Sequence, residues 1–163
     1  MTHPHLDAAA QAQAEFTKAK RNAFRLLKVR DRSVHEIRHR LKQYGFPDAI
    51  VAKTIEYLIA VRLIDDRQFV DSWARTHLMR GYGIARIKQE LQDKGIDPAL
   101  LENELARLTQ GYREEDAAAF EARKRALKYS DVTDKEKIQK RVFEYLAGRG
   151  FNPDAIEKAV EQL

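Results

Sequence analysis

Apolar side chains recur along this chain at the three- and four-residue spacings that place them on one face of an α-helix. The clearest sets are Val34, Ile37 and Leu41, then Ile84, Ile87 and Leu91, and later Val142 and Leu146. A glycine stands four residues after the last member of each set, at positions 45, 95 and 150. A second helical set follows each glycine, which predicts pairs of short helices joined by a tight turn.

These offsets define an internal repeat. The sets after the glycines are Val51, Ile55 and Leu58, then Leu101, Leu105 and Leu108, and then Ile156, Val160 and Leu163. A further helix precedes each pair, with apolar residues at Ala23, Leu26 and Leu27, at Phe69, Val70 and Trp73, and at Phe120 and Leu127. Equivalent glycines are 50 and then 55 residues apart, so we place five extra residues of the third repeat near 130–134.

Helix start signals agree with this division. The pairs at 97–98 and 152–153 combine an N-cap Asp or Asn with a first-turn proline, whereas Pro47 occupies the cap position itself. Thr133 and Glu136 have the spacing of a capping box ahead of the third repeat's middle helix. We expect the glycines that follow the middle helices to adopt the left-handed conformation that ends a helix.

The pattern predicts an all-α fold of three tandem three-helix repeats, each resembling a helix-turn-helix, that stack into an elongated and curved array. We divide the chain into a helical N-terminal lead-in at 1–18, which we expect to be frayed, and repeats at 19–64, 65–113 and 114–163.

The composition narrows the class of protein. The chain has 163 residues, of which 44% are hydrophobic and none is cysteine, which excludes disulfides, thiolate zinc sites and cysteine nucleophiles. No apolar run approaches the roughly 18 residues that cross a bilayer, and no signal-peptide pattern opens the chain. We therefore expect a cytoplasmic protein without membrane association.

One motif suggests catalysis. His35, Glu36 and His39 match the HExxH pattern of zinc peptidases, and Glu56 could be offered as a third ligand. However, Ser33 and Glu36 form a capping box, and both histidines lie on the helix face opposite the apolar stripe. The arginines and lysine around them would also repel a cation. We therefore predict no metal, no cofactor, no small-molecule substrate and no enzymatic activity.

Basic residues concentrate in the first repeat. Residues 21–65 carry a net charge of +5, which equals that of the whole chain and suits contact with phosphates. The predicted contact residues are Arg25, Lys28, Arg30, Arg32, Arg38, Arg40 and Lys42, extended by Arg86 and Lys88 of the second repeat. A secondary basic cluster comprises Arg123, Lys124, Arg125, Lys128, Arg141 and Arg149.

A helix-turn-helix topology suggests an alternative, a stand-alone regulator that inserts the helix after each turn into duplex DNA. The exposed residues of those helices argue against it. The helix at 153–163 sets Lys158 against Asp154, Glu157 and Glu161, and the helix at 48–59 offers only Lys53 among acidic residues. These helices would repel phosphates.

The sequence resembles the RecX family, bacterial regulators of the RecA recombinase. The resemblance covers about residues 22–163, and its carriers are 30–33 with Arg40-Leu41, 64–69 with Trp73, 83–91, 94–96 and 149–151. Asp65 and Asp66 can cap the helix that bears Trp73, and Gly83 is expected to end the preceding helix.

The resemblance implies a protein that lies along the groove of the RecA filament on single-stranded DNA. Such a protein limits ATPase, strand-exchange and coprotease activity without chemistry of its own, and thereby acts in DNA repair, recombination and the SOS response. The implied partners are the RecA filament and single-stranded DNA.

Overall fold

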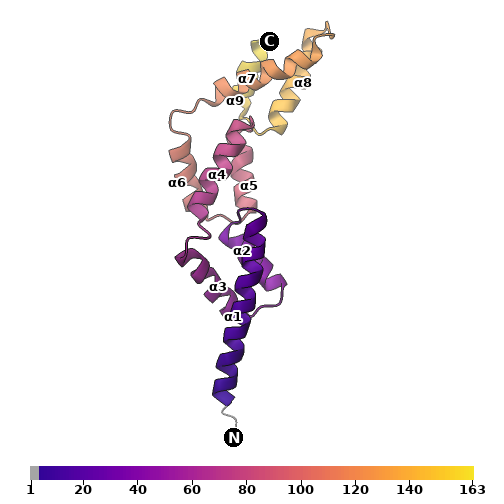
Figure 1. Ribbon diagram of the computed structural model, residues 1–163. Helices are drawn as coiled ribbons and strands as arrows, with labels where there is room; N and C mark the ends of the chain where they lie inside the picture. Colours follow the sequence, from indigo (N-terminus) through magenta and orange to yellow (C-terminus); the bar gives the residue numbers. More distant parts are fainter. Residues whose placement is uncertain (1–3) are drawn as a thin grey trace. The chain divides into compact units, whose positions relative to one another are not determined.

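The computed structural model describes residues 4–163 and contains, within them, nine α-helices, one short 3-10 helix and no strand (Figure 1). The helices are α1 (Pro4–Val29), α2 (Val34–Gln43), α3 (Asp48–Ala60), α4 (Asp66–Met79), α5 (Ile84–Asp93), α6 (Pro98–Leu108), α7 (Glu114–Ala126), η1 (Leu127–Tyr129), α8 (Lys135–Gly148) and α9 (Pro153–Glu161). Within this part of the chain, no helix is both long enough and apolar enough to span a bilayer. The all-α prediction and the grouping of helices in threes are confirmed.

The chain divides into two compact units. The first comprises the chain up to Phe69 together with Lys94–Ile96, and the second comprises Val70–Asp93 and Asp97–Leu163. Each unit has its own apolar core.

The first helix of each repeat packs through a pair of small or β-branched residues one turn apart. Ala19 and Ala23 in α1, Val70 and Ala74 in α4, and Ala118 and Ala122 in α7 are all fully buried. The middle helices contribute Ile37 and Leu41, Ile87 and Leu91, and Val142 and Leu146, which are also buried. Small side chains let neighbouring helices approach closely, so these pairs set where the larger residues of the middle helix pack.

The N-terminal lead-in is continuous with the first repeat. Helix α1 passes the expected division at residue 18 without interruption, and Phe16 is buried against Tyr57 with ring centroids 6.0 Å apart at nearly a right angle. Residues 8–14 are exposed, and residues 1–3, which include His3, lie outside the described residues. The helix therefore begins at Pro4 and joins the core from Phe16 onward.

Most of the expected caps are present. Ser33 accepts a hydrogen bond from the Glu36 amide and Glu36 accepts one from the Ser33 amide, which completes the capping box. Asp97 and Asn152 cap α6 and α9, and Pro47 occupies the cap position of α3 without a side-chain bond.

The third repeat departs from the predicted cap. The N-cap of α8 is Asp134, not Thr133, and its carboxylate accepts from the Lys137 amide. Helix α8 has 14 residues where α2 and α5 each have 10. Much of the insertion therefore lengthens α8. The helix starts after Asp134 because that side chain reaches the Lys137 amide.

The glycines at 45, 95 and 150 have positive φ, as expected, but the prediction for Gly83 is wrong. Gly81 has φ +74° and ends α4, whereas Gly83 stands directly before α5. A Cβ on Gly83 would lie 2.0 Å from the carbonyl oxygen of Gly150, so a close backbone approach requires glycine there.

The same contact between successive repeats occurs in both units. In the first unit, the amide of Val34 donates to Asp66 at 2.8 Å, and in the second the amide of Ile84 donates to Glu114 at 3.0 Å. Asp66 and Glu114 are each the first residue of a repeat's first helix. The first amides of a helix have no partner within that helix. The second and third repeats therefore each supply a carboxylate that accepts from such an amide in the repeat before.

Where α3 ends, Arg62 has φ +56° and is the one residue other than glycine with a positive φ in the described part of the chain. Gly111, in the turn after α6, has φ +77°. Because a Cβ raises the energy of the left-handed region, we expect Arg62→Gly to raise the free energy of unfolding by about 1 kcal/mol. Gly111→Ala places a Cβ at a positive φ and is expected to lower the free energy of unfolding by a similar amount. Because that Cβ would meet no neighbour, the backbone conformation is the only cost. Urea titrations of both variants check the pair, and a destabilised Arg62→Gly protein would show that the Arg62 side chain is needed for stability.

Candidate nucleic-acid interface

The α1 cations lie on the helix face that points away from the core. At about 100° per residue, Arg25 and Lys28 lie within about 60° of each other and opposite the buried Ala19 and Ala23. Arg25 donates to the Asn22 side chain at 2.6 Å, and both Arg25 and Lys28 are exposed. These two predicted contact residues therefore share one solvent-facing stripe.

Arg30 and Arg32 begin a second group in the loop before α2. Arg30 binds Glu36 with two hydrogen bonds of 2.7 and 3.1 Å, and this bonding raises the pKa of Arg30. Burial acts to raise the pKa of Glu36, but the bonds from Arg30 and from the Ser33 amide bring it below its usual value, with Lys94 3.7 Å away. Glu36 is thus fully engaged in holding the loop and the helix start.

Arg32 is placed among other cations. Its Nε donates to the Leu26 carbonyl at 3.3 Å, and its pKa is lowered, first by burial and then by the charges of Arg30 and Arg40. A guanidinium stays charged even so. The charges of Arg30 and Arg40 thus act against Arg32, and Glu36, which is bound to Arg30, partly offsets them.

Arg38 and Lys42 lie on the other edge of α2. They are one turn apart, whereas Arg38 and Arg40 are about 160° apart around the helix axis. Lys42 pairs with Asp48 at 2.8 Å, which lowers the pKa of Asp48 through that hydrogen bond. Arg38 is exposed and has no ion pair or hydrogen bond among the described residues. The predicted contact residues of α2 therefore lie along two edges of the helix, one on each side of its buried face.

The second-repeat pair, Arg86 and Lys88, is engaged within the second unit. Arg86 donates to Glu90 at 2.9 Å and to the Gly148 carbonyl at 3.1 Å, and Lys88 forms an ion pair with Glu102. Any phosphate would have to compete with these partners.

Four arginines of the second unit alternate with tyrosine rings, an arrangement that the sequence analysis missed. Arg86 and Arg149 lie over Tyr82 at 4.5 and 4.7 Å, measured from guanidinium carbon to ring centroid. The row continues through Tyr145, Arg125, Tyr129 and Arg141 with distances of 4.7 to 5.4 Å. Only the fold brings these residues together, because they come from three separate stretches of the chain, 82–86, 125–129 and 141–149.

Several residues of the secondary basic cluster belong to this arginine–tyrosine row or have other partners within the second unit. Arg149 also donates to the carbonyls of Arg80 and Gly81, and Lys124 lies 3.5 Å from the buried Glu121. Arg123 and Lys128 are exposed. Half of the cluster, Arg125, Arg141 and Arg149, therefore packs on rings, which fixes the geometry of their guanidinium groups.

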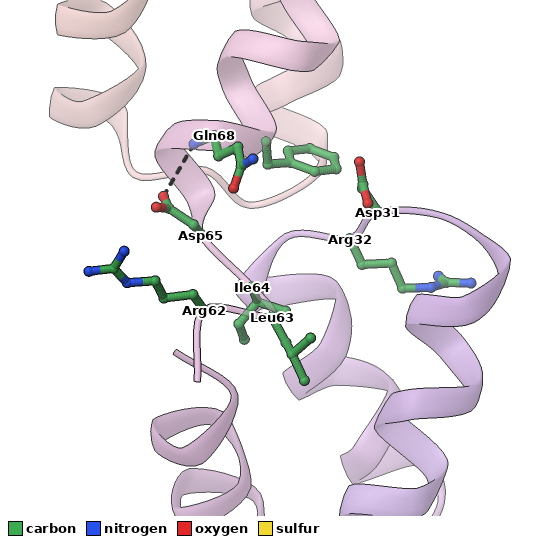
Figure 2. A pocket seen from close by; sticks show the side chains of 8 residues that line it. Asp31, Arg32, Arg62, Leu63, Ile64, Asp65 and Gln68 are labelled. Carbon is green, nitrogen blue, oxygen red and sulfur yellow. Dashed lines mark hydrogen bonds between the residues drawn. The ribbon is translucent and has the colours of Figure 1, made fainter. Parts of the chain in front are cut away.

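A cavity of about 240 Å³ lies in the first unit where the loop before α2 meets the α3–α4 loop (Figure 2). Its lining includes Asp31, Arg32, Arg62, Asp65 and Gln68. Asp65 accepts from the Arg67 and Gln68 amides at 2.8 and 3.2 Å and so begins α4, as expected. In Figure 2 the side chains of Arg32 and Arg62 extend in opposite directions, so they do not converge on one anion.

The histidines of the HExxH motif are exposed. The rings of His35 and His39 stack with centroids 6.3 Å apart, and His39 contacts the Gln43 amide group at 2.9 Å. Among the residues that the structure describes, no group of three His, Asp or Glu side chains is placed to hold a metal. The rings of His77 and Trp73 stack with centroids 4.4 Å apart, and His77 lies 3.4 Å from Glu90.

These features define a tandem three-helix repeat protein with a basic first repeat. Family models match all three repeats: the RecX first three-helix domain at residues 19–58, the second at 65–105 and the third at 113–160. The chain belongs to the RecX family.

Relatives and solved structures agree with this assignment. The chain is 32% identical over 153 residues to regulatory protein RecX of Mycolicibacterium smegmatis, covering 91% of this chain and 81% of the relative. It is 33% identical over 150 residues to regulatory protein RecX of Legionella pneumophila, covering 90% and 95%. A crystal structure of RecX from Lactobacillus salivarius has a TM-score of 0.77 at 24% identity, covering 93% of this chain and 97% of that one. A second crystal structure of a regulatory protein RecX has a TM-score of 0.81 at 22% identity, covering 99% and 80%.

Proposed function

We propose that this protein modulates the RecA recombinase by binding along the RecA filament on single-stranded DNA. In this role it limits the ATPase, strand-exchange and coprotease activities of RecA and carries out no reaction itself. The family assignment supports a regulatory protein. The observation that supports the contact surface is the concentration of exposed cations on α1, on α2 and in the loop between them: Arg25, Lys28, Arg38 and Arg40 are all exposed.

The alternative, a helix-turn-helix regulator of duplex DNA, requires the third helix of a repeat to face phosphates. The α3 residue best suited to that role, Lys53, has its ammonium 4.5 Å over the Phe16 ring. Exposed Asp48 and Glu56 remain on the same helix. The acidic character of these helices favours the filament proposal.

We expect the double charge reversal Arg38→Glu, Arg40→Glu to weaken inhibition of RecA about tenfold, because it removes cations from both edges of α2 and adds repulsion toward phosphates. The measurement is ATP hydrolysis by RecA on single-stranded DNA with substoichiometric additions of this protein. Circular dichroism should show unchanged helicity, since both side chains are exposed.

The matched control is Lys135→Glu, Lys137→Glu, which changes the net charge equally in the first turn of α8. Acidic residues suit a helix N-terminus, so this variant should fold and inhibit like the parent protein. Unchanged inhibition by the Arg38, Arg40 variant would remove α2 from the contact surface. The two single reversals would show which edge of α2 matters more.

A salt titration separates the filament proposal from the alternative. A protein that contacts mainly phosphates loses affinity steeply as salt rises, whereas a sequence-specific repressor keeps strong discrimination for its duplex site. We expect steep salt dependence on single-stranded DNA. Tight binding to one duplex sequence at high salt would support the regulator instead.

A further inference from the structure

The turn after α2 is open, although the equivalent turns of the other two repeats are covered. A Cβ built on Gly95 would meet His35, and one built on Gly150 would meet Arg86, each at less than 3 Å. A Cβ built on Gly45 would meet nothing within 4 Å. The first repeat therefore presents a bare surface where later repeats dock on the preceding one.

The residue before each glycine shows the same difference. Lys94 accepts a hydrogen bond from Ser33 through its carbonyl at 2.6 Å and lies 3.7 Å from Glu36 through its ammonium. Arg149 donates to the carbonyls of Arg80 and Gly81. Their counterpart in the first repeat is Tyr44, whose side chain makes no such contact and is 48% exposed.

Tyr44 is nevertheless held in place. It is the C-cap residue of α2, and its amide donates to the Arg40 carbonyl at 3.1 Å. The Arg40 guanidinium lies 5.5 Å from the ring centroid and is itself bonded to the Gln43 side chain at 3.0 Å. The backbone of Tyr44 is thus fixed at the helix end, and its ring is a solvent-exposed aromatic surface beside a cation.

A second cation lies close by. Arg32 lies in the loop before α2, and after burial and the charge of Arg30, the charge of Arg40 contributes to the lowering of its pKa. Two acidic groups of this region are already bound, Glu36 by Arg30 and Asp48 by Lys42, whereas Asp31, next to Arg32, is exposed. Arg40, the cation beside the ring, forms no ion pair among the described residues, so its charge is available to an anion.

Other exposed aromatic residues lack this setting. Phe24 packs toward Tyr57 with centroids 6.5 Å apart. Phe120 and Phe143 are exposed on α7 and α8, and in the described part of the chain neither has a guanidinium or ammonium group over its ring. An exposed ring beside a basic groove is the arrangement with which proteins stack unpaired bases and hold the adjoining phosphates.

We propose that Tyr44 is a stacking platform for an unpaired nucleobase of single-stranded DNA, with Arg32 and Arg40 contacting the phosphates on either side of it. This inference rests on the proposed function and names the chemistry of one contact in it. It requires bases as well as phosphates, which separates it from simple charge attraction.

Abasic DNA provides the test. The full chain is titrated against two fluorescent oligomers of equal length, oligo-dT and an oligomer of abasic sugar phosphates, with anisotropy as the readout. We expect the protein to bind oligo-dT about tenfold more tightly. Tyr44→Ala should bind both oligomers equally, at the affinity of the parent protein for the abasic one, and Tyr44→Phe should retain the preference.

The controls distinguish the platform from the phosphate surface. Phe143→Ala, at a comparably exposed aromatic residue, should keep the full preference for bases. The Arg38→Glu, Arg40→Glu variant should weaken binding to both oligomers. A Tyr44→Ala protein that still prefers oligo-dT, or a parent protein with no preference, would overturn the platform alone. A parent protein that binds neither oligomer would overturn the platform together with its proposed single-stranded DNA contact.

Discussion

The Gly83→Ala variant is expected to lose about 3 kcal/mol of stability in the second unit. The added Cβ would lie 2.0 Å from the Gly150 carbonyl oxygen and 2.3 Å from the Phe151 amide nitrogen, and both are backbone atoms that cannot rotate away. The Gly83 amide also donates to the Arg149 carbonyl at 2.8 Å. The two segments must therefore separate, which breaks this bond and shifts backbone in a packed core.

Hydrogen exchange locates this effect. We expect the amides of Gly83 and Phe151 to lose protection in Gly83→Ala, while Leu41 and Leu58 in the first unit keep theirs. Gly148→Ala is the matched control, because its Cβ meets nothing within 4 Å and alanine favours a helix more than glycine does. A Gly83→Ala protein as stable as the parent would contradict the close approach of the two turns.

Ser33→Ala is expected to lower the free energy of unfolding of the first unit by roughly 2–3 kcal/mol. The fully buried Ser33 hydroxyl accepts from the Glu36 amide at 3.1 Å and donates to the Lys94 carbonyl at 2.6 Å. Loss of an N-cap costs about 1 kcal/mol. Leaving a partly buried carbonyl without its donor adds about 1–2 kcal/mol.

Comparison with Ser33→Gly separates the two contributions. Glycine at an N-cap costs only a few tenths of a kcal/mol relative to serine, yet it also removes the bond to the Lys94 carbonyl. In urea titrations, we expect Ser33→Gly to lie between Ser33→Ala and the parent protein. Equal stability of all three proteins would show that the bond between Ser33 and Lys94 contributes nothing.

Much of the fold could be predicted from residues that lie close together in the sequence. The set Ile37 and Leu41 and its counterparts predicted which faces of the middle helices are buried, because one helical turn places such residues on one side. Ser33, Asp97 and Asn152 were predicted as caps because a cap bonds an amide only two or three residues away. Thr133 failed because Asp134, one residue later, supplies a competing cap.

The candidate site was less predictable. The sequence showed that cations concentrate in the first repeat, but helix geometry sends Arg38 and Arg40 to opposite edges of α2. The engagement of Arg86 by the Gly148 carbonyl, 62 residues away, has no local signal. Tyr44 was not singled out, because its exposure depends on whether another repeat covers the turn beside it.

By itself, the sequence determined the helical class, the threefold repetition and the excess positive charge of the first repeat, since each follows from residue types and short-range spacing. The tertiary structure decided which cations are free, which are stacked on tyrosines, and why Gly83 and Ser33 must be small. Those properties arise from contacts between segments distant in sequence, and their energies depend on distances that only the packed chain sets.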